Sequence, residues 1–214
     1  MTAPRRPPEP AESPERLKLF TDAVVAIALT LLILPLLETV PEAAKEHLST
    51  QGWLRAHAEL LFLFALSFLL IASLWTVHSR VFGHVEWLSG RLRALNFVWM
   101  FAVVFLPVAT ALIGLSGAGG TPAALYVGTL LLGNLAMSAM VVVLARTPAL
   151  VSPERPLESR SVATSFGATL LYALALVLTL ARPGTDYRAL LLLLLLPLAS
   201  RLLRPLCRRL GLGV

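Results

Sequence analysis

The feature that most constrains the fold of this chain is a long apolar run that begins with polar and charged residues. Residues 16–37 carry Arg16, Thr21 and Asp22 in their first turns, and every residue after Asp22 is apolar except Thr30. An α-helix needs about 20 apolar residues to cross a hydrocarbon core of ~30 Å, so this run predicts a membrane-spanning helix. A charge so close to hydrocarbon is costly without a partner, which makes Asp22 a candidate functional residue.

Further apolar runs of similar kind follow along the chain, at about residues 56–78, 93–115, 122–145, 161–181 and 187–203. The last run is short, but Arg201 can extend to the membrane surface and Tyr187 can anchor there. The chain of 214 residues is 57% hydrophobic and only 14% charged, whereas soluble domains carry about 25% charged residues. We therefore predict an all-α integral membrane protein with six transmembrane helices. These helices occupy residues 15–206, between a flexible N-terminus (1–14) and a tail (207–214).

The basic residues predict the orientation of these helices. Fourteen of the 18 Lys and Arg residues fall on the side that holds both termini, and four fall on the other side, namely Lys45, Arg55, Arg182 and Arg188. Because cytoplasmic loops are enriched in Lys and Arg, both termini are expected in the cytoplasm, and the protein is expected in the cell membrane. The net charge of +6 is then a topology signal, and no nucleic-acid partner is predicted.

The sequence gives no sign of an enzyme. The single cysteine, Cys207, excludes an internal disulfide and a cysteine-based zinc site. The histidines do not cluster at metal-ligand spacing, and no phosphate-binding loop, nucleophile elbow or HExxH motif occurs. Inside the spans, ionisable residues lie only toward the ends. We predict no catalytic residue, no metal site and no cofactor.

The first helix divides into two faces. At about 100° per residue, Ile27, Leu31 and Leu34 form one apolar stripe. Thr30 lies about 60° to one side of this stripe and Asp22 about 140° away from it. The stripe would present rings of aliphatic side chains if several copies met, and Asp22 is expected to face the bundle of its own chain.

Partners for Asp22 are available at the same depth. Trp75 and His78 end the second span on the cytoplasmic side, and Asn96 begins the third span there. A network from Asp22 to His78 or Asn96 is therefore plausible. Two alternatives remain open at this point. Asp22 could pair with Lys18 one turn earlier, and the aromatic residues could be interfacial anchors.

These residues together resemble a known family. The segment Arg16-x-x-x-Phe20-Thr21-Asp22, opening an apolar helix, resembles the Arg-x-x-x-Phe-Ser-Asp motif of the transmembrane protein 175 family of potassium channels, in its single-repeat prokaryotic branch. The similarity extends over about residues 16–115. It includes the segments 26–34, Trp75-x-x-His78-x-x-x-Phe82, Leu95-Asn96 and Leu106-Pro107.

This resemblance implies a homotetramer of six-helix subunits in the lipid bilayer, with the first helix of each lining a central pore for potassium ions. The family's hydrophobic gate and filter would correspond to Ile27, Leu31 and Leu34, and a threonine associated with potassium preference would correspond to Thr30. Single-repeat members are less selective than two-repeat members, so modest selectivity is implied.

The resemblance also implies a polar network that holds the pore helix. Its members here would be Arg16, Phe20, Thr21, Asp22, Trp75, His78 and Asn96. The chain departs from the motif at Thr21, where the family usually has serine. Threonine keeps the hydroxyl group but is stiffer about χ1, so the network is expected to repack around it.

The alternative is a non-conducting membrane scaffold or a small-solute carrier. Carriers usually contain inverted repeats and helices that are broken near the middle of the membrane. The motif of the first helix occurs once, and the sequence predicts a first helix that is unbroken up to Pro35. Both observations favour the channel.

Overall fold

The described part of the chain is a bundle of long helices. The computed structural model describes residues 13–116, 120–156 and 159–181, with Leu202 and Pro205 as isolated positions. Its elements are α1 (Glu15–Leu31), α2 (Leu34–Lys45), α3 (Thr50–Ala56), α4 (Ala58–Phe82), α5 (Gly90–Ser116), α6 (Gly120–Arg146), the short 3₁₀ helix η1 (Pro148–Leu150) and α7 (Ser159–Ala181). Residues 1–12 of the predicted N-terminal segment 1–14, the predicted tail 207–214 and almost all of the predicted sixth span lie outside the described residues.

Five segments in the described ranges are long and apolar enough to cross a membrane. They are Glu15–Lys45, Ala58–Phe82, Gly90–Gly114, Gly120–Arg146 and Val162–Ala181. Each coincides with one of the first five predicted spans, with ends that differ by a few residues except at the first. There the span runs on through α2. The all-helical architecture predicted from the sequence is therefore confirmed for this part of the chain.

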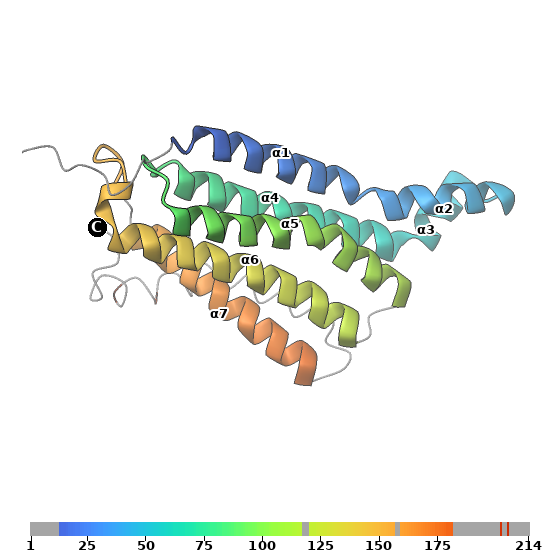
Figure 1. Cartoon of the computed structure of the whole chain (residues 1–214). Coiled ribbons are helices and arrows are strands. Elements are labelled where there is room, and N and C mark those ends of the chain that lie inside the picture. The colour runs from blue at the N-terminus through green and yellow to red at the C-terminus, as the bar shows by residue number, and fades with distance from the viewer. Residues whose placement is uncertain (1–12, 117–119, 157–158, 182–201, 203–204, 206–214) are drawn as a thin grey trace, which may run out of the picture.

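The long helices lie side by side, with α1 and α2 along one edge and α7 along the opposite edge (Figure 1). Helices α5 and α6 form the centre and bury the largest side chains, among them Trp99 and Tyr126. A Cβ placed on Gly133 of α6 would meet the Cβ of Ala102 on α5 at 3.5 Å. Small residues of this kind let two membrane helices approach closely.

The first span is interrupted, which corrects the prediction of one helix over 16–37. Helix α1 ends at Leu31, the next two residues form a turn, and α2 begins at Leu34. Pro35 has no N–H to donate to the carbonyl of Leu31, and its ring crowds that carbonyl. The amides of Leu36 and Leu37 both donate to Ile33 O, each at 3.1 Å. The break therefore comes before the proline, not after it.

Helix α1 also begins one residue later than the capping pattern predicts. The sequence favours Ser13 as the N-cap with Pro14 as the first helical residue. In the structure the helix begins at Glu15, and Ser13 Oγ accepts a hydrogen bond of 3.4 Å from the Glu15 amide. Ser13 thus still satisfies one of the free amides of the first turn.

Candidate pore helix and its polar anchor

Helix α1 is attached to the bundle by one face. Thr21, Val25 and Ala28 on this face are buried, and Leu32 continues the row beyond the end of the helix. These positions follow the i, i+4, i+7, i+11 spacing of a single helical stripe. The stripe packs on α4 and α5, which lie beside α1 in Figure 1.

The opposite face carries the four residues predicted to line a pore. Ile27, Leu31 and Leu34 are 59%, 38% and 46% exposed, and Thr30 is also exposed. The Thr30 hydroxyl donates to Ile27 O at 2.8 Å. No other described part of the chain covers this apolar stripe.

A buried chain of hydrogen bonds fixes α1 to its neighbours. His78 Nε2 on α4 lies 2.6 Å from Asn96 Oδ1 on α5, and Asn96 Nδ2 donates to Thr21 Oγ1 at 2.9 Å. The Thr21 hydroxyl in turn donates to Met100 Sδ at 3.5 Å. The amide of Asn96 thus links three helices at a point where all of these groups are buried.

Two aromatic rings enclose His78. Phe82 stacks on its imidazole with a centroid distance of 4.2 Å, and Trp99 stacks on it at 4.3 Å. Trp99 is fully buried, and its Nε1 has no hydrogen-bond partner among the described residues. Trp99 was not predicted as a site residue from the sequence. Its position could have indicated this role, because Trp99 lies one turn after Asn96 on α5 and residues three apart share a helix face.

Asp22 is placed differently from the expectation. It is exposed, and its Oδ1 accepts a hydrogen bond of 2.8 Å from Trp75 Nε1. The structure therefore pairs Asp22 with Trp75 and leaves the buried partners His78 and Asn96 to Thr21. Consecutive helical residues differ by about 100° in direction, so only one of Thr21 and Asp22 can point into the bundle. Burying a neutral hydroxyl costs less free energy than burying a carboxylate, so Thr21 occupies the buried position.

The remaining motif residues stand outside this network. The side chains of Arg16 and Phe20 are exposed, and neither makes a hydrogen bond with another described residue. Lys18 pairs with Glu15 at 3.4 Å, so the alternative partner considered for Asp22 is already engaged.

Small polar residues form further buried hydrogen bonds between helices, which were not predicted from the sequence. Ser67 Oγ on α4 lies 2.9 Å from both Thr110 Oγ1 on α5 and Tyr126 Oη on α6. A second cluster joins α6 to α7 through Ser138, Ser165 and Thr169. The sequence indicates such hydrogen bonds only weakly, because single Ser and Thr residues are common within apolar runs.

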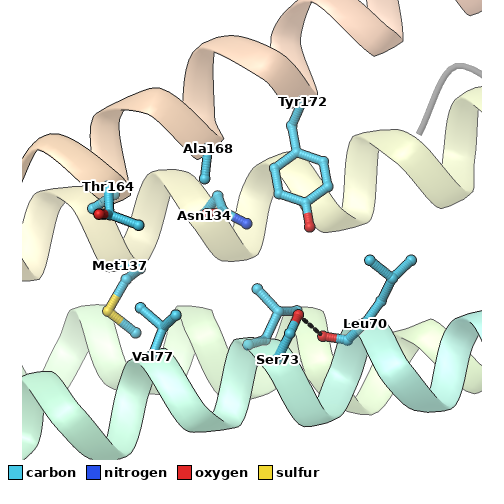
Figure 2. A pocket seen from close by; sticks show the side chains of 10 residues that line it. Leu70, Ser73, Val77, Asn134, Met137, Thr164, Ala168 and Tyr172 are labelled. Carbon is cyan, nitrogen blue, oxygen red and sulfur yellow. Dashed lines mark hydrogen bonds between the residues drawn. The ribbon is translucent and has the colours of Figure 1, made fainter. Parts of the chain in front are cut away.

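The bundle also contains a cavity remote from α1. It has a volume of about 180 Å³ and lies between α4, α6 and α7. Figure 2 shows the Tyr172 hydroxyl pointing toward α4, with Met137 and Val77 facing each other at the other side. None of the predicted site residues lines it, and no group of three or more metal-ligating side chains occurs among the described residues.

Fold and site together define a multi-pass helical membrane protein whose first helix is held by one polar face and exposes an apolar stripe on the other. The family model described as endosomal/lysosomal potassium channel TMEM175 matches residues 16–107. A potassium channel of Streptomyces collinus is 32% identical over 186 residues, which cover 79% of this chain and 87% of that protein. The chain therefore belongs to the TMEM175 family. This is a family of ion channels, which agrees with the prediction that the chain is not an enzyme.

This chain matches a smaller part of another relative. The endosomal/lysosomal proton channel TMEM175 of Mus musculus is 30% identical over 103 residues, which are 48% of this chain and 20% of that protein. This chain thus matches about a fifth of the length of the mouse relative. A crystal structure of a lysosomal potassium-selective channel TMEM175 homolog from Chamaesiphon minutus matches with a TM-score of 0.66 at 22% identity. The match covers 89% of this chain and 97% of that one, and it supports the fold.

Proposed function

We propose that this chain forms a potassium-permeable cation channel in which α1 lines the pore. The observation that carries the proposal is the uncovered stripe of Ile27, Leu31 and Leu34, opposite a face that buried hydrogen bonds attach to α4 and α5. A rigidly held helix with an uncovered apolar face is what a subunit needs in order to line a shared pore. The potassium channel of Streptomyces collinus, matched over most of its length, supports the choice of ion.

Four copies of the chain would surround one pore. Each would contribute α1, so that the three aliphatic positions form three successive rings. If the side chains of a ring nearly touch, the segment loses its water, and an ion would have to shed hydration that nothing replaces. The rings then act as the gate, and a small dilation admits a partly hydrated cation. Such a path needs no cofactor. In the membrane, both termini of each subunit would lie in the cytoplasm.

Thr30 would supply the selectivity of this path. Its hydroxyl hydrogen is used in the bond to Ile27 O at 2.8 Å. A hydroxyl oxygen has two lone pairs besides its one donor, so the oxygen is free to face a cation. A ring of four such oxygens can replace part of the hydration shell of potassium. It gives weaker discrimination than a filter built from many carbonyl groups.

The decisive experiment is ion flux through purified protein in liposomes. The wild type should conduct potassium faster than sodium, and Ile27→Asn should raise the flux because an amide in the ring keeps the segment hydrated. Leu170→Asn on α7 is the matched control, since Leu170 is 58% exposed but lies on the far edge of the bundle. An equal increase of ion flux in Ile27→Asn and Leu170→Asn would refute the assignment of the gate to Ile27.

The same liposomes also test the competing functions. A flux of protons without potassium would favour the activity named for the mouse relative. No flux of any cation from wild type or Ile27→Asn would favour a scaffold or carrier. The carrier receives some support from the break between α1 and α2, because broken helices are typical of transporters. The single copy of the motif still argues against it.

A further inference from the structure

A cavity at the end of the bundle where α1 begins is lined by two arginines. It has a volume of about 330 Å³ and lies between the α4–α5 loop, the start of α5 and the end of α6. Arg91 comes from the first turn of α5, and Arg146 from the last turn of α6. Both side chains are exposed, and neither forms an ion pair within the described ranges. The described lining contains no Asp or Glu.

The position of Arg91 is electrostatically unfavourable without an anion. A helix N-terminus carries a partial positive charge and favours acidic residues in its first turn. Helix α5 has no acidic residue there. It has Arg91 there instead. Arg146 by itself is ordinary, because a basic residue suits a helix C-terminus. The excess positive charge at this cavity is therefore concentrated at the start of α5.

The start of α5 is also open to a ligand. Ser89 Oγ accepts a hydrogen bond of 3.2 Å from the Leu92 amide, and Ser89 O accepts one from the Arg93 amide at 3.0 Å. A Cβ placed on Gly90 would meet nothing within 4 Å. These bonds use the amides of Leu92 and Arg93, so a phosphate oxygen at this terminus would meet the amides of Gly90 and Arg91.

The cavity is rigidly built on its other side. The amides of Glu86 and Trp87 donate to Leu150 O at 2.9 and 3.3 Å, and the Ser152 amide donates to His84 O at 2.9 Å. An isolated β-bridge joins Val85 to Val151. These bonds hold the α4–α5 loop against η1, so the lining residues keep their places.

The rest of the lining suits a lipid. Val142 and Val143 on α6 extend the wall toward the middle of the span, and Trp87 stands at the rim, 36% exposed. Tryptophan is enriched where membrane and water meet. Basic pockets between transmembrane helices bind anionic lipid headgroups. A soluble phosphate ester without an acyl chain could bind the two arginines but would make no apolar contact with Val142 and Val143.

We propose that this cavity binds the phosphate of an anionic phospholipid, with Arg91 and Arg146 on the phosphate and an acyl chain along Val142 and Val143. The bound lipid joins the start of α5 to the end of α6. It also offsets the positive charge that Arg91 adds to the α5 terminus. The site is separate from the stripe on α1 and does not depend on ion conduction.

The test is the melting temperature of the purified full-length protein in detergent, with added phosphatidylglycerol, phosphatidylcholine or glycerol phosphate. Phosphatidylglycerol should raise it, and phosphatidylcholine at the same mole fraction should not. The rise should disappear in the double variant Arg91→Gln, Arg146→Gln. It should persist in Arg80→Gln, which removes an exposed arginine at the same end of the bundle but outside the cavity.

A second variant separates this site from general surface charge. Val142→Trp fills the cavity and leaves every arginine in place, so it should also abolish the rise, and native mass spectrometry should then find fewer bound phosphatidylglycerol molecules. A rise of equal size with glycerol phosphate would overturn the lipid assignment. A rise that survives in the double variant or in Val142→Trp would overturn the site.

Discussion

Thr21 and Asp22 are adjacent in sequence but have opposite surroundings. Thr21 is buried beside Asn96, whereas Asp22 is exposed beside Trp75. The sequence identifies both as unusual, because both are polar in the first turns of an apolar helix. It does not fix the rotation of the helix about its axis, which depends on the packing of α4 and α5. This is why Thr21, His78 and Asn96 could be named as candidates from the sequence, whereas their pairing and the contact with Met100 could not.

Asn96 is the residue on which the anchor of α1 depends. Replacing it in Asn96→Leu leaves His78 Nε2 buried without a partner and leaves the Thr21 hydroxyl with Met100 Sδ alone. An unsatisfied buried polar group costs about 1–3 kcal/mol, so the melting temperature of the purified protein should fall clearly. Ser73→Ala is the control, because the Ser73 hydroxyl is exposed and bonds only within its own helix, to Leu70 O. Equal melting temperatures for Asn96→Leu and the wild type would contradict the anchor.

Thr30 is predicted to set the ionic preference without setting the size of the flux. Thr30→Val keeps the shape of the side chain and removes the oxygen. A contact of this kind contributes on the order of 1 kcal/mol, which corresponds to roughly a fivefold change. The ratio of potassium to sodium flux in liposomes should therefore fall by about that factor while total flux persists. An unchanged ratio would exclude Thr30 from selectivity.

Among the helices, prolines have different consequences. Pro35 accompanies a break between α1 and α2, whereas α5 continues through Pro107 and α2 continues through Pro41. Helix α5 is packed on α4 and α6 along its length, and these contacts hold its shape. Hydropathy alone could locate the five spans, but the effect of each proline depends on its neighbours, so the break was not predicted.

The break has a consequence for gating, because Leu31 ends α1 and Leu34 begins α2. In the proposed tetramer, the two rings would therefore belong to different helical segments and could dilate independently. In Pro35→Ala, the new amide can donate to Leu31 O and join the segments into one helix. Potassium flux should fall, because opening would then require both rings to move together.

Pro41→Ala is the control for this variant, since Pro41 lies within the continuous part of α2. Its flux should match that of the wild type. If Pro35→Ala conducts as the wild type does while circular dichroism shows added helix, the break has no part in gating.

Across the whole molecule, positive charge is concentrated at one end. Eight of the ten Lys and Arg residues in the described ranges lie at the end where α1 begins, and the opposite end has Lys45 and Arg55. The opposite end also carries the exposed acids Glu38, Glu42 and Glu59, which line one cavity. The sequence could predict this asymmetry because it depends only on the order of spans and loops. It predicts that the α1 end lies in the cytoplasm.

The orientation can be tested with single cysteines in a Cys207→Ser background. Glu154→Cys lies in the loop before α7, at the basic end, and Gln51→Cys lies in α3, at the acidic end; both positions are exposed. In intact cells, a maleimide that cannot cross membranes should label Gln51→Cys and not Glu154→Cys. After the cells are broken open, it should label both, which controls for reactivity. Labelling of Glu154→Cys in intact cells would reverse the orientation. It would place the cavity between Arg91 and Arg146 in the outer leaflet, and the Glu38 cavity at the cytoplasmic mouth of the pore.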